Sequence, residues 1–164
     1  MYHHPQPFTP DGENAHLQRG DVVLFRFPLA EEDDQPGAPK RRPCLVLDTL
    51  TAGDDRFVEI AYGTSADTRA NRGYEVIVKQ SAARETAGLS KPTRFVCARR
   101  IIVHVSHSSF HGRTKGPQII GRLDDALLER MNAVRARIQA EADIAAHCRE
   151  ERWRDEQTRE DRGF

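Results

Sequence analysis

Cysteine is scarce in this chain, and long apolar runs are missing. The 164 residues include three cysteines, Cys44, Cys97 and Cys148, an odd number with no Cys-x-x-Cys pair. This usage excludes a disulfide framework and favours a reducing, cytoplasmic compartment. No segment is long and apolar enough to predict a membrane span, and the first residues lack the apolar centre of a secretion signal. We therefore expect no membrane partner.

A net charge of one sign is also lacking. Lysine plus arginine and aspartate plus glutamate each number 25, so no overall field draws the chain toward nucleic acid. The charge is uneven along the sequence, because residues 84–115 hold seven basic side chains against one acidic side chain, Glu85. Both a basic patch and a merely solvated face fit that segment.

The most informative stretch runs from residue 40 to residue 65. It contains two apolar runs, Cys44–Leu47 and Phe57–Tyr62, separated by the polar sequence Ala-Gly-Asp-Asp. Apolar runs bounded by such a polar, glycine-containing segment predict two antiparallel strands joined by a turn.

In this hairpin the start of the first strand lies beside the end of the second. Arg42 should therefore lie close to Thr64 and Ser65 at one rim of a sheet. A fixed guanidinium beside two hydroxyl groups is suited to holding a phosphate. The alternative is a solvated arginine at a strand start next to a polar strand end.

The remaining pattern predicts a mainly β, α+β domain. Further strands are expected at residues 22–27, 74–78, 94–98, 101–105 and 117–123, and a short helical turn at 79–87. Asp124 is a good helix N-cap, and an apolar stripe follows it at Leu127, Met131, Val134 and Ile138. Six or seven short strands with one C-terminal helix predict a half-open barrel.

Histidines and a lone tryptophan add two weaker signals. His104, His107 and His111 straddle a strand end and a loop with no cysteine or carboxylate to complete a shell, so we expect no metal site. Trp153 lies in a highly charged segment with the acid-before-arginine spacing of an exposed helix. It is either an anchor for a partner chain or a solitary exposed aromatic.

Five short motifs in a fixed order carry a resemblance to a known family. They are Gly20-Asp21-Val-Val-Leu, Arg42-Pro43-Cys-Leu-Val-Leu, Ala61-Tyr-Gly-Thr64-Ser65, Gly88-Leu-Ser-Lys91-Pro-Thr93 and Ile120-Gly-Arg-Leu123. Over residues 19–138 the chain resembles the MazF/PemK toxins of bacterial toxin–antitoxin pairs. It departs from their usual pattern at Tyr62-Gly63, where proline and an aliphatic residue are common, and at Ala98-Arg99-Arg100, where an acidic residue is common.

The resemblance implies an SH3-like, PemK/CcdB-like barrel, a homodimer and a partner antitoxin. It also implies an endoribonuclease that needs no metal or other cofactor and cuts single-stranded RNA to a 2′,3′-cyclic phosphate. Arg42 and Thr64 match family positions, and we take Arg42, Thr64 and Ser65 as the catalytic candidates. The candidates for RNA backbone contacts are Lys40, Arg41, Lys91 and Arg94.

Two other functions fit the same residues. One is a non-catalytic SH3-like module that binds RNA or a protein, and the other is a toxin acting on a protein target such as gyrase. For the domain layout we expect a flexible N-terminal arm at residues 1–19, a PemK/MazF-like barrel domain with its helix at 20–146, and a charged helical tail at 147–164. Within the barrel we expect a mobile loop at residues 29–39.

Overall fold

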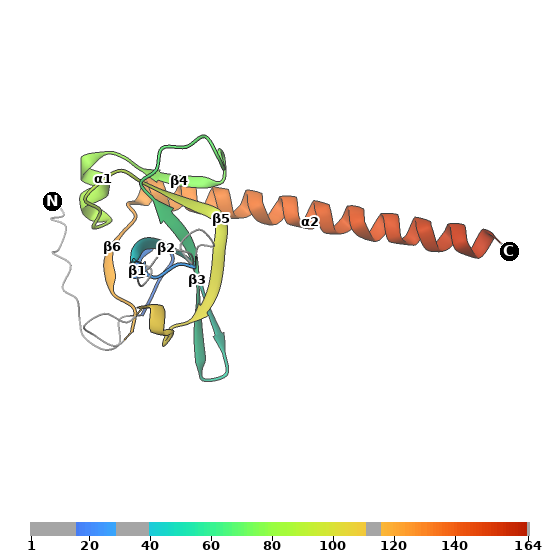
Figure 1. The fold of residues 1–164 in the computed structure, drawn as a ribbon, viewed down its shortest axis with the longest axis horizontal. Helices are drawn as coiled ribbons and strands as arrows, with labels where there is room; N and C mark the ends of the chain where they lie inside the picture. Colours follow the sequence, from blue (N-terminus) through green and yellow to red (C-terminus); the bar gives the residue numbers. More distant parts are fainter. Residues whose placement is uncertain (1–15, 29–39, 111–115, 164) are drawn as a thin grey trace, which may run out of the picture.

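The computed structural model describes residues 16–28, 40–110 and 116–163 (Figure 1). Residues 1–15 of the expected arm, the expected loop at 29–39 and His111 lie outside the described residues. The strands are β1 (Asp21–Phe25), β2 (Arg42–Ala52), β3 (Asp55–Thr64), β4 (Glu75–Val78), β5 (Thr93–His104) and β6 (Ile119–Arg122). The helices are α1 (Ser81–Thr86) and α2 (Asp125–Arg162), with a 3-10 turn at Ser108–Phe110.

The described strands form one antiparallel sheet in the order β4-β5-β3-β2-β1-β6. The sheet curls strongly, and its two edge strands are not paired with each other in the described chain (Figure 1). The mainly β, half-open architecture with a C-terminal helix is therefore confirmed. The central hairpin of β2 and β3 is the one expected from residues 40–65.

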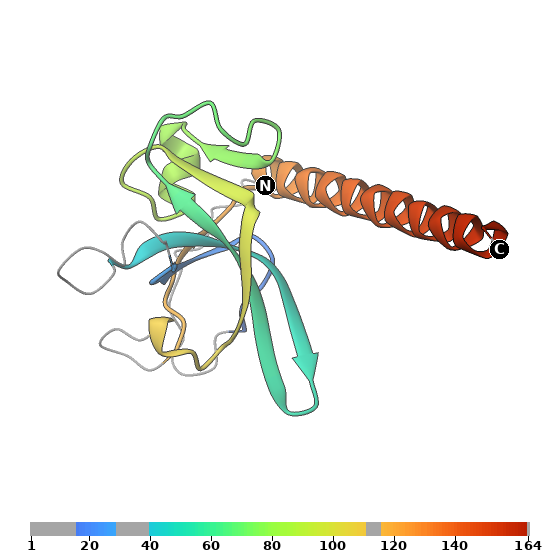
Figure 2. The ribbon, with the colours of Figure 1, turned by 45° about the vertical axis from the view of Figure 1, so that its right-hand side comes forward.

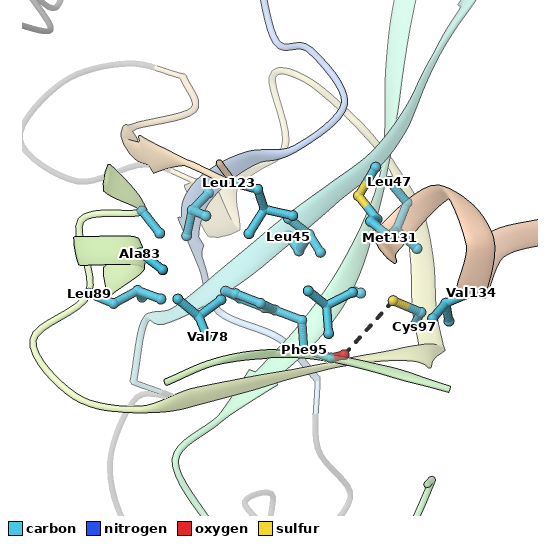
Figure 3. Packing of buried hydrophobic residues seen from close by; sticks show 14 residues of the cluster. Leu45, Leu47, Val78, Ala83, Leu89, Phe95, Cys97, Leu123, Met131 and Val134 are labelled. Atoms are coloured by element: carbon cyan, nitrogen blue, oxygen red, sulfur yellow. Dashed lines mark hydrogen bonds between the residues drawn. The ribbon is translucent and has the colours of Figure 1, made fainter. Parts of the chain in front are cut away.

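β2 and β3 contain continuous apolar runs, and not alternating apolar and polar residues, because both faces of the curled sheet are covered. Leu45 and Leu47 point into one core with residues of α1 and α2, whereas Cys44 and Val46 point into a second core. Figure 3 shows the first core closing around Phe95. Each fully buried aliphatic or aromatic side chain contributes about 1.5–3 kcal/mol through the hydrophobic effect.

Helix α2 begins as the sequence predicts. The Asp124 carboxylate accepts a hydrogen bond from the Leu127 backbone N–H at 2.8 Å, which caps the first turn. The expected apolar stripe packs into the first core, with Met131 and Val134 fully buried. No helix in the described part of the chain is long and apolar enough to cross a membrane.

The second half of α2 leaves the sheet and continues as one helix to Arg162 (Figures 1 and 2). Trp153 lies on this half with 63% of its surface exposed, and Ile144 is 64% exposed. Ion pairs between residues four apart, such as Arg154 with Glu150 at 3.8 Å, lie along it.

The two strands expected at 94–98 and 101–105 are one strand, β5, and that prediction is wrong. Tyr62 of β3 pairs with Val96, whereas the preceding Ala61 pairs with Arg100. Residues 97–99 are therefore accommodated as a bulge in a continuous ladder. The charged pair Arg99-Arg100 interrupts the apolar pattern and so predicts the end of a strand, but a bulge allows the strand to continue through it.

Candidate functional site

The start of β2 and the end of β3 border a cleft with a volume of about 410 Å³. The hairpin register pairs Cys44 with Tyr62, and continuing it by two residues places Arg42 opposite Thr64. The cleft is lined by Leu24, Arg42, Pro43, Gly63, Thr64, Ser65, Gly88, Leu89, Ser90, Lys91, Thr93 and Ile120. The structure thus brings Arg42, Thr64 and Ser65 together as the hairpin argument requires, and it adds Lys91. Their roles in catalysis and binding stay predictions.

Gly63 allows the two strands to meet closely at this rim. A Cβ atom at position 63 would lie 2.1 Å from the Pro43 carbonyl oxygen and 2.9 Å from the Phe95 ring. No side chain fits there without moving backbone. The Tyr62-Gly63 sequence, which departs from the usual family pattern, is therefore matched to the local packing.

The opposite wall of the cleft is the segment from Gly88 to Lys91. Gly88 ends α1 with φ +69°, and a Cβ there would lie 2.0 Å from the Ile120 carbonyl oxygen of β6. Arg84 of α1 donates a hydrogen bond to the Ser90 carbonyl at 3.0 Å. This wall is therefore held by the backbone contact with β6 and by the side chain of Arg84.

The described residues that line the cleft carry positive charge. Its lining includes the side chains of Arg42 and Lys91 and hydroxyl groups of serine and threonine, and no described lining residue is acidic. Cations and hydroxyl donors without a competing carboxylate are the groups that bind an oxyanion. The lining predicts a phosphate or carboxylate ligand.

The Thr64 hydroxyl is already oriented. Its Oγ1 accepts a hydrogen bond from the Ala66 backbone N–H at 3.1 Å. Because that oxygen is engaged as an acceptor, its own hydrogen can be donated to a ligand in the cleft.

A second cationic group lies near Arg42, and sequence reasoning missed it. The guanidinium carbon of Arg99 is 5.0 Å from the centre of the Tyr62 ring, and that of Arg42 is 6.0 Å from the same centre. Phe27 packs against Tyr62 with ring centroids 5.4 Å apart. The bulge in β5 places Arg99 here, so Arg99 joins the candidates for backbone contacts.

Arg94 is a correction to the predicted RNA contacts. The residue is 8% exposed, and it forms an ion pair with Glu75, which is 7% exposed. Its other hydrogen bonds go to the segment 66–70. Since each of its N–H groups is used inside the protein, Arg94 has no donor to offer to RNA.

Lys40 and Arg41 lie directly before β2, at the end of the strand that opens onto the cleft. Lys40 is exposed and Arg41 is half-buried, and neither is among the lining residues of the cleft. They lie next to Arg42, which lines the cleft, and their role stays a prediction.

No described cysteine or histidine lines the cleft. Burial raises the pKa of the Cys44 thiol to about 12, so it stays protonated at neutral pH. The His104 side chain pairs with Asp55 at 3.1 Å, and the His107 ring packs on Phe25. No three His, Cys, Asp or Glu side chains gather around a possible metal position in the described chain.

Fold and cleft together define a small, mainly β protein with a half-open barrel and a positively charged cleft that carries hydroxyl groups. A family model of the PemK-like, MazF-like toxins of type II toxin–antitoxin systems matches residues 18–140. The chain belongs to this family, whose toxins are each paired with an antitoxin. The comparison with individual curated proteins gave no match.

Proposed function

We propose that this toxin is an endoribonuclease that cuts single-stranded RNA in the cleft between Arg42, Thr64 and Lys91. The observation that carries the proposal is the composition of the cleft lining, which brings the cations Arg42 and Lys91 together with several serine and threonine hydroxyl groups. Family membership supports it, because the match spans the whole of the barrel and the first turns of α2.

The reaction is an attack of the RNA 2′-oxygen on the adjacent phosphorus. The bond between that oxygen and phosphorus forms, the bond to the 5′-oxygen breaks, and the products end in a 2′,3′-cyclic phosphate and a 5′-hydroxyl. The protein must align the attacking oxygen with the leaving oxygen and stabilise the charge on the phosphate. No metal or other cofactor is required by this chemistry.

Each cleft residue has a role in this scheme. Arg42 holds two phosphate oxygens with its planar guanidinium and stabilises the transition state. In this scheme it also donates a proton to the leaving 5′-oxygen and regains it from solvent. Thr64 donates its hydroxyl hydrogen to the phosphate or the 2′-oxygen, with Ser65 as the neighbouring donor. Because no described lining residue is a carboxylate or an imidazole, we assign the proton of the 2′-OH to solvent.

The RNA strand binds as an unpaired, extended chain. Helical RNA hides its base edges in a narrow major groove, so single-stranded bases are the ones that a shallow surface can meet. Lys91, Arg99, Lys40 and Arg41 contact phosphates on either side of the cleft. We also propose that the toxin acts in the cytoplasm, forms a homodimer and is inhibited by its antitoxin.

Two assays test the nuclease against its alternatives. Purified protein incubated with long single-stranded RNA in EDTA should fragment the RNA, and an RNA-binding module should bind without fragmenting it. A toxin that acts on a protein such as gyrase should lose its effect on growth when the chain is truncated after Ala146. The nuclease should retain that effect and lose it instead with Arg42→Ala.

A further inference from the structure

The guanidinium of Arg94 has an acceptor for each of its five N–H groups. Its Nε donates to Glu75 Oε2 at 2.9 Å, and one Nη2 hydrogen bonds the same oxygen. Its Nη1 donates to the Ala66 carbonyl at 3.0 Å and to Thr68 Oγ1 at 3.0 Å, and Nη2 also donates to the Ala70 carbonyl at 2.9 Å. One side chain therefore binds β4 and three residues of a single segment.

That segment, residues 66–70, leaves β3 directly after the cleft hydroxyls. It has no regular helix or strand to hold its backbone. Arg94 donates hydrogen bonds to acceptors of residues 66, 68 and 70 from the interior of the protein. The path of the chain immediately after Ser65 is therefore set by Arg94.

Ala66 joins Arg94 to the cleft. Its carbonyl accepts from Arg94, and its backbone N–H donates to Thr64 Oγ1 at 3.1 Å. Moving Ala66 would move the group that orients the Thr64 hydroxyl. Arg94 is thus linked to the Thr64 side chain through Ala66, in addition to facing Thr64 in the ladder of β5 with β3, and it is not among the lining residues of the cleft.

A purely structural explanation for this pair is weak. A buried ion pair is often no more stabilising than apolar side chains of the same volume. A planar guanidinium held by a buried carboxylate can, however, fix several carbonyl oxygens in one orientation. This geometry suits a residue that positions a loop.

We propose that Arg94, oriented by Glu75, is a positioning residue for the cleft. It holds Ala66 so that the Thr64 hydroxyl points its hydrogen at the ligand. The effect on catalysis rests on the proposed ribonuclease function, whereas the effect on Ala66 and Thr64 does not.

The experiment compares full-length wild type with Arg94→Lys, which keeps the charge but has three N–H donors in place of five and cannot serve both Glu75 and three acceptors of the segment. Amide exchange of Ala66, measured by NMR, reports the bond to Thr64 directly. Rates of RNA cleavage in EDTA give kcat and KM separately. The matched control is Arg122→Lys, which disturbs another arginine bound to a buried carboxylate, Asp21, at 3.0 Å.

We expect exchange at Ala66 to rise about tenfold or more in Arg94→Lys and to stay near the wild-type rate in the control. The kcat of Arg94→Lys should fall about as far as that of Thr64→Val, with KM changed less than about threefold. In the Thr64→Val background, Arg94→Lys should cause little further loss, because both changes remove the same oriented hydroxyl.

The proposal would be overturned if the amide of Ala66 exchanged as slowly in Arg94→Lys as in wild type. It would also be overturned if that exchange became faster while kcat stayed unchanged. A double variant whose fold-loss of kcat equals the product of the losses in Arg94→Lys and Thr64→Val would also overturn it. If wild type cleaves no RNA, the proposed function fails and the Ala66 exchange alone decides the positioning. If Arg94→Lys does not fold, Glu75→Gln takes its place, since it keeps one acceptor oxygen for Arg94.

Discussion

Two pockets in the described chain have similar volumes, but they differ in the charged residues that line them. The cleft at the end of β2 and β3 measures about 410 Å³, and a polar depression between the sheet and α2 measures about 340 Å³. The depression is lined by Asp48, Glu59, Arg100, Asn132, Arg135, Ala136 and Gln139.

In the depression each carboxylate is already paired. Asp48 contacts Arg135 at 3.1 Å, and Glu59 contacts Arg100 at 3.0 Å. These pairs join the sheet to α2 and leave little charge for a ligand. The cleft, by contrast, has cations and hydroxyls with no acidic residue in its described lining. The kind of residues in the described lining, more than volume, distinguishes the two pockets.

The largest effect is expected from the buried pair behind the cleft. Arg94→Met leaves Glu75 buried without its cation, which should lower the free energy of unfolding by about 3–5 kcal/mol. Arg100→Met in the depression removes a pair whose arginine side chain is 34% exposed, and it should cost about 1 kcal/mol or less. Urea unfolding of both variants measures the difference. Equal losses would contradict the distinction between the two regions.

Arg42→Ala should have the next largest effect, on cleavage and not on folding. Loss of a preorganised phosphate donor costs about 3 kcal/mol in the transition state, a rate loss of roughly a hundredfold or more. Arg135→Ala in the depression should keep cleavage within about twofold of wild type, since it touches no cleft residue. Single-turnover rates on one RNA substrate make the comparison. Comparable losses in both variants would place the chemistry elsewhere.

Asp48 should give a smaller, pH-dependent effect. Partial burial raises its pKa, but hydrogen bonds from Arg19 and the Thr49 backbone N–H, with the charge of Arg135, outweigh burial and leave the pKa below its ordinary value. A carboxyl with a lowered folded-state pKa stabilises the protein above its unfolded-state pKa, and the contribution is lost as the pH falls through the folded-state pKa.

Asp48→Asn should therefore lower the free energy of unfolding by about 1 kcal/mol at pH 7. The difference between the variant and wild type should begin to narrow as the pH falls below about 4, the ordinary pKa of the carboxyl in the unfolded chain, and should vanish only below the lower folded-state pKa, where the carboxyl is protonated in both states. Thermal unfolding across this pH range provides the measurement. A difference in the free energy of unfolding that grows toward low pH would mean that the charged Asp48 carboxylate destabilises the folded protein.

The smallest effect is expected from Lys91, as a contact to one phosphate. Lys91→Ala should reduce the slope of log binding affinity against log salt by about 0.7, the value for one contact to a single strand. Gln139→Ala in the depression should leave the slope unchanged. Fluorescence anisotropy with an uncleavable RNA at several salt concentrations gives both slopes. A slope altered equally by both changes would argue against a defined path through the cleft.

The hairpin could be predicted from the sequence because its information is local. Two apolar runs and a polar turn predict the hairpin, and the hairpin brings Arg42 close to Thr64 and Ser65. The shift in register between Val46 and Asp48, which places Arg42 opposite Thr64 and not opposite Ser65, could not be predicted in this way. The start of α2 was equally local, since Asp124 and the apolar stripe after it need no knowledge of the rest of the fold.

Arg94 was misassigned because a sequence shows charge but not burial. Its partner Glu75 lies in the neighbouring strand β4, in an apolar sequence like its own. Pairing β4 with residues 93–96 of β5 shows one charged residue on each side, of opposite sign, and this pattern could have found the pair. Arg99 was missed for a different reason, because the bulge that brings it to Tyr62 depends on the pairing of β5 with β3.

The most direct test of the central claim is the chemistry at the cut in RNA. Once a cleavage position is mapped, the same RNA is made with a single 2′-deoxynucleotide on the 5′ side of that position and incubated with wild type in EDTA. The account predicts a 2′,3′-cyclic phosphate and a 5′-hydroxyl from native RNA and no cleavage at the deoxy position. Cleavage of the deoxy RNA at that position, or a 5′-phosphate in the product, would contradict it.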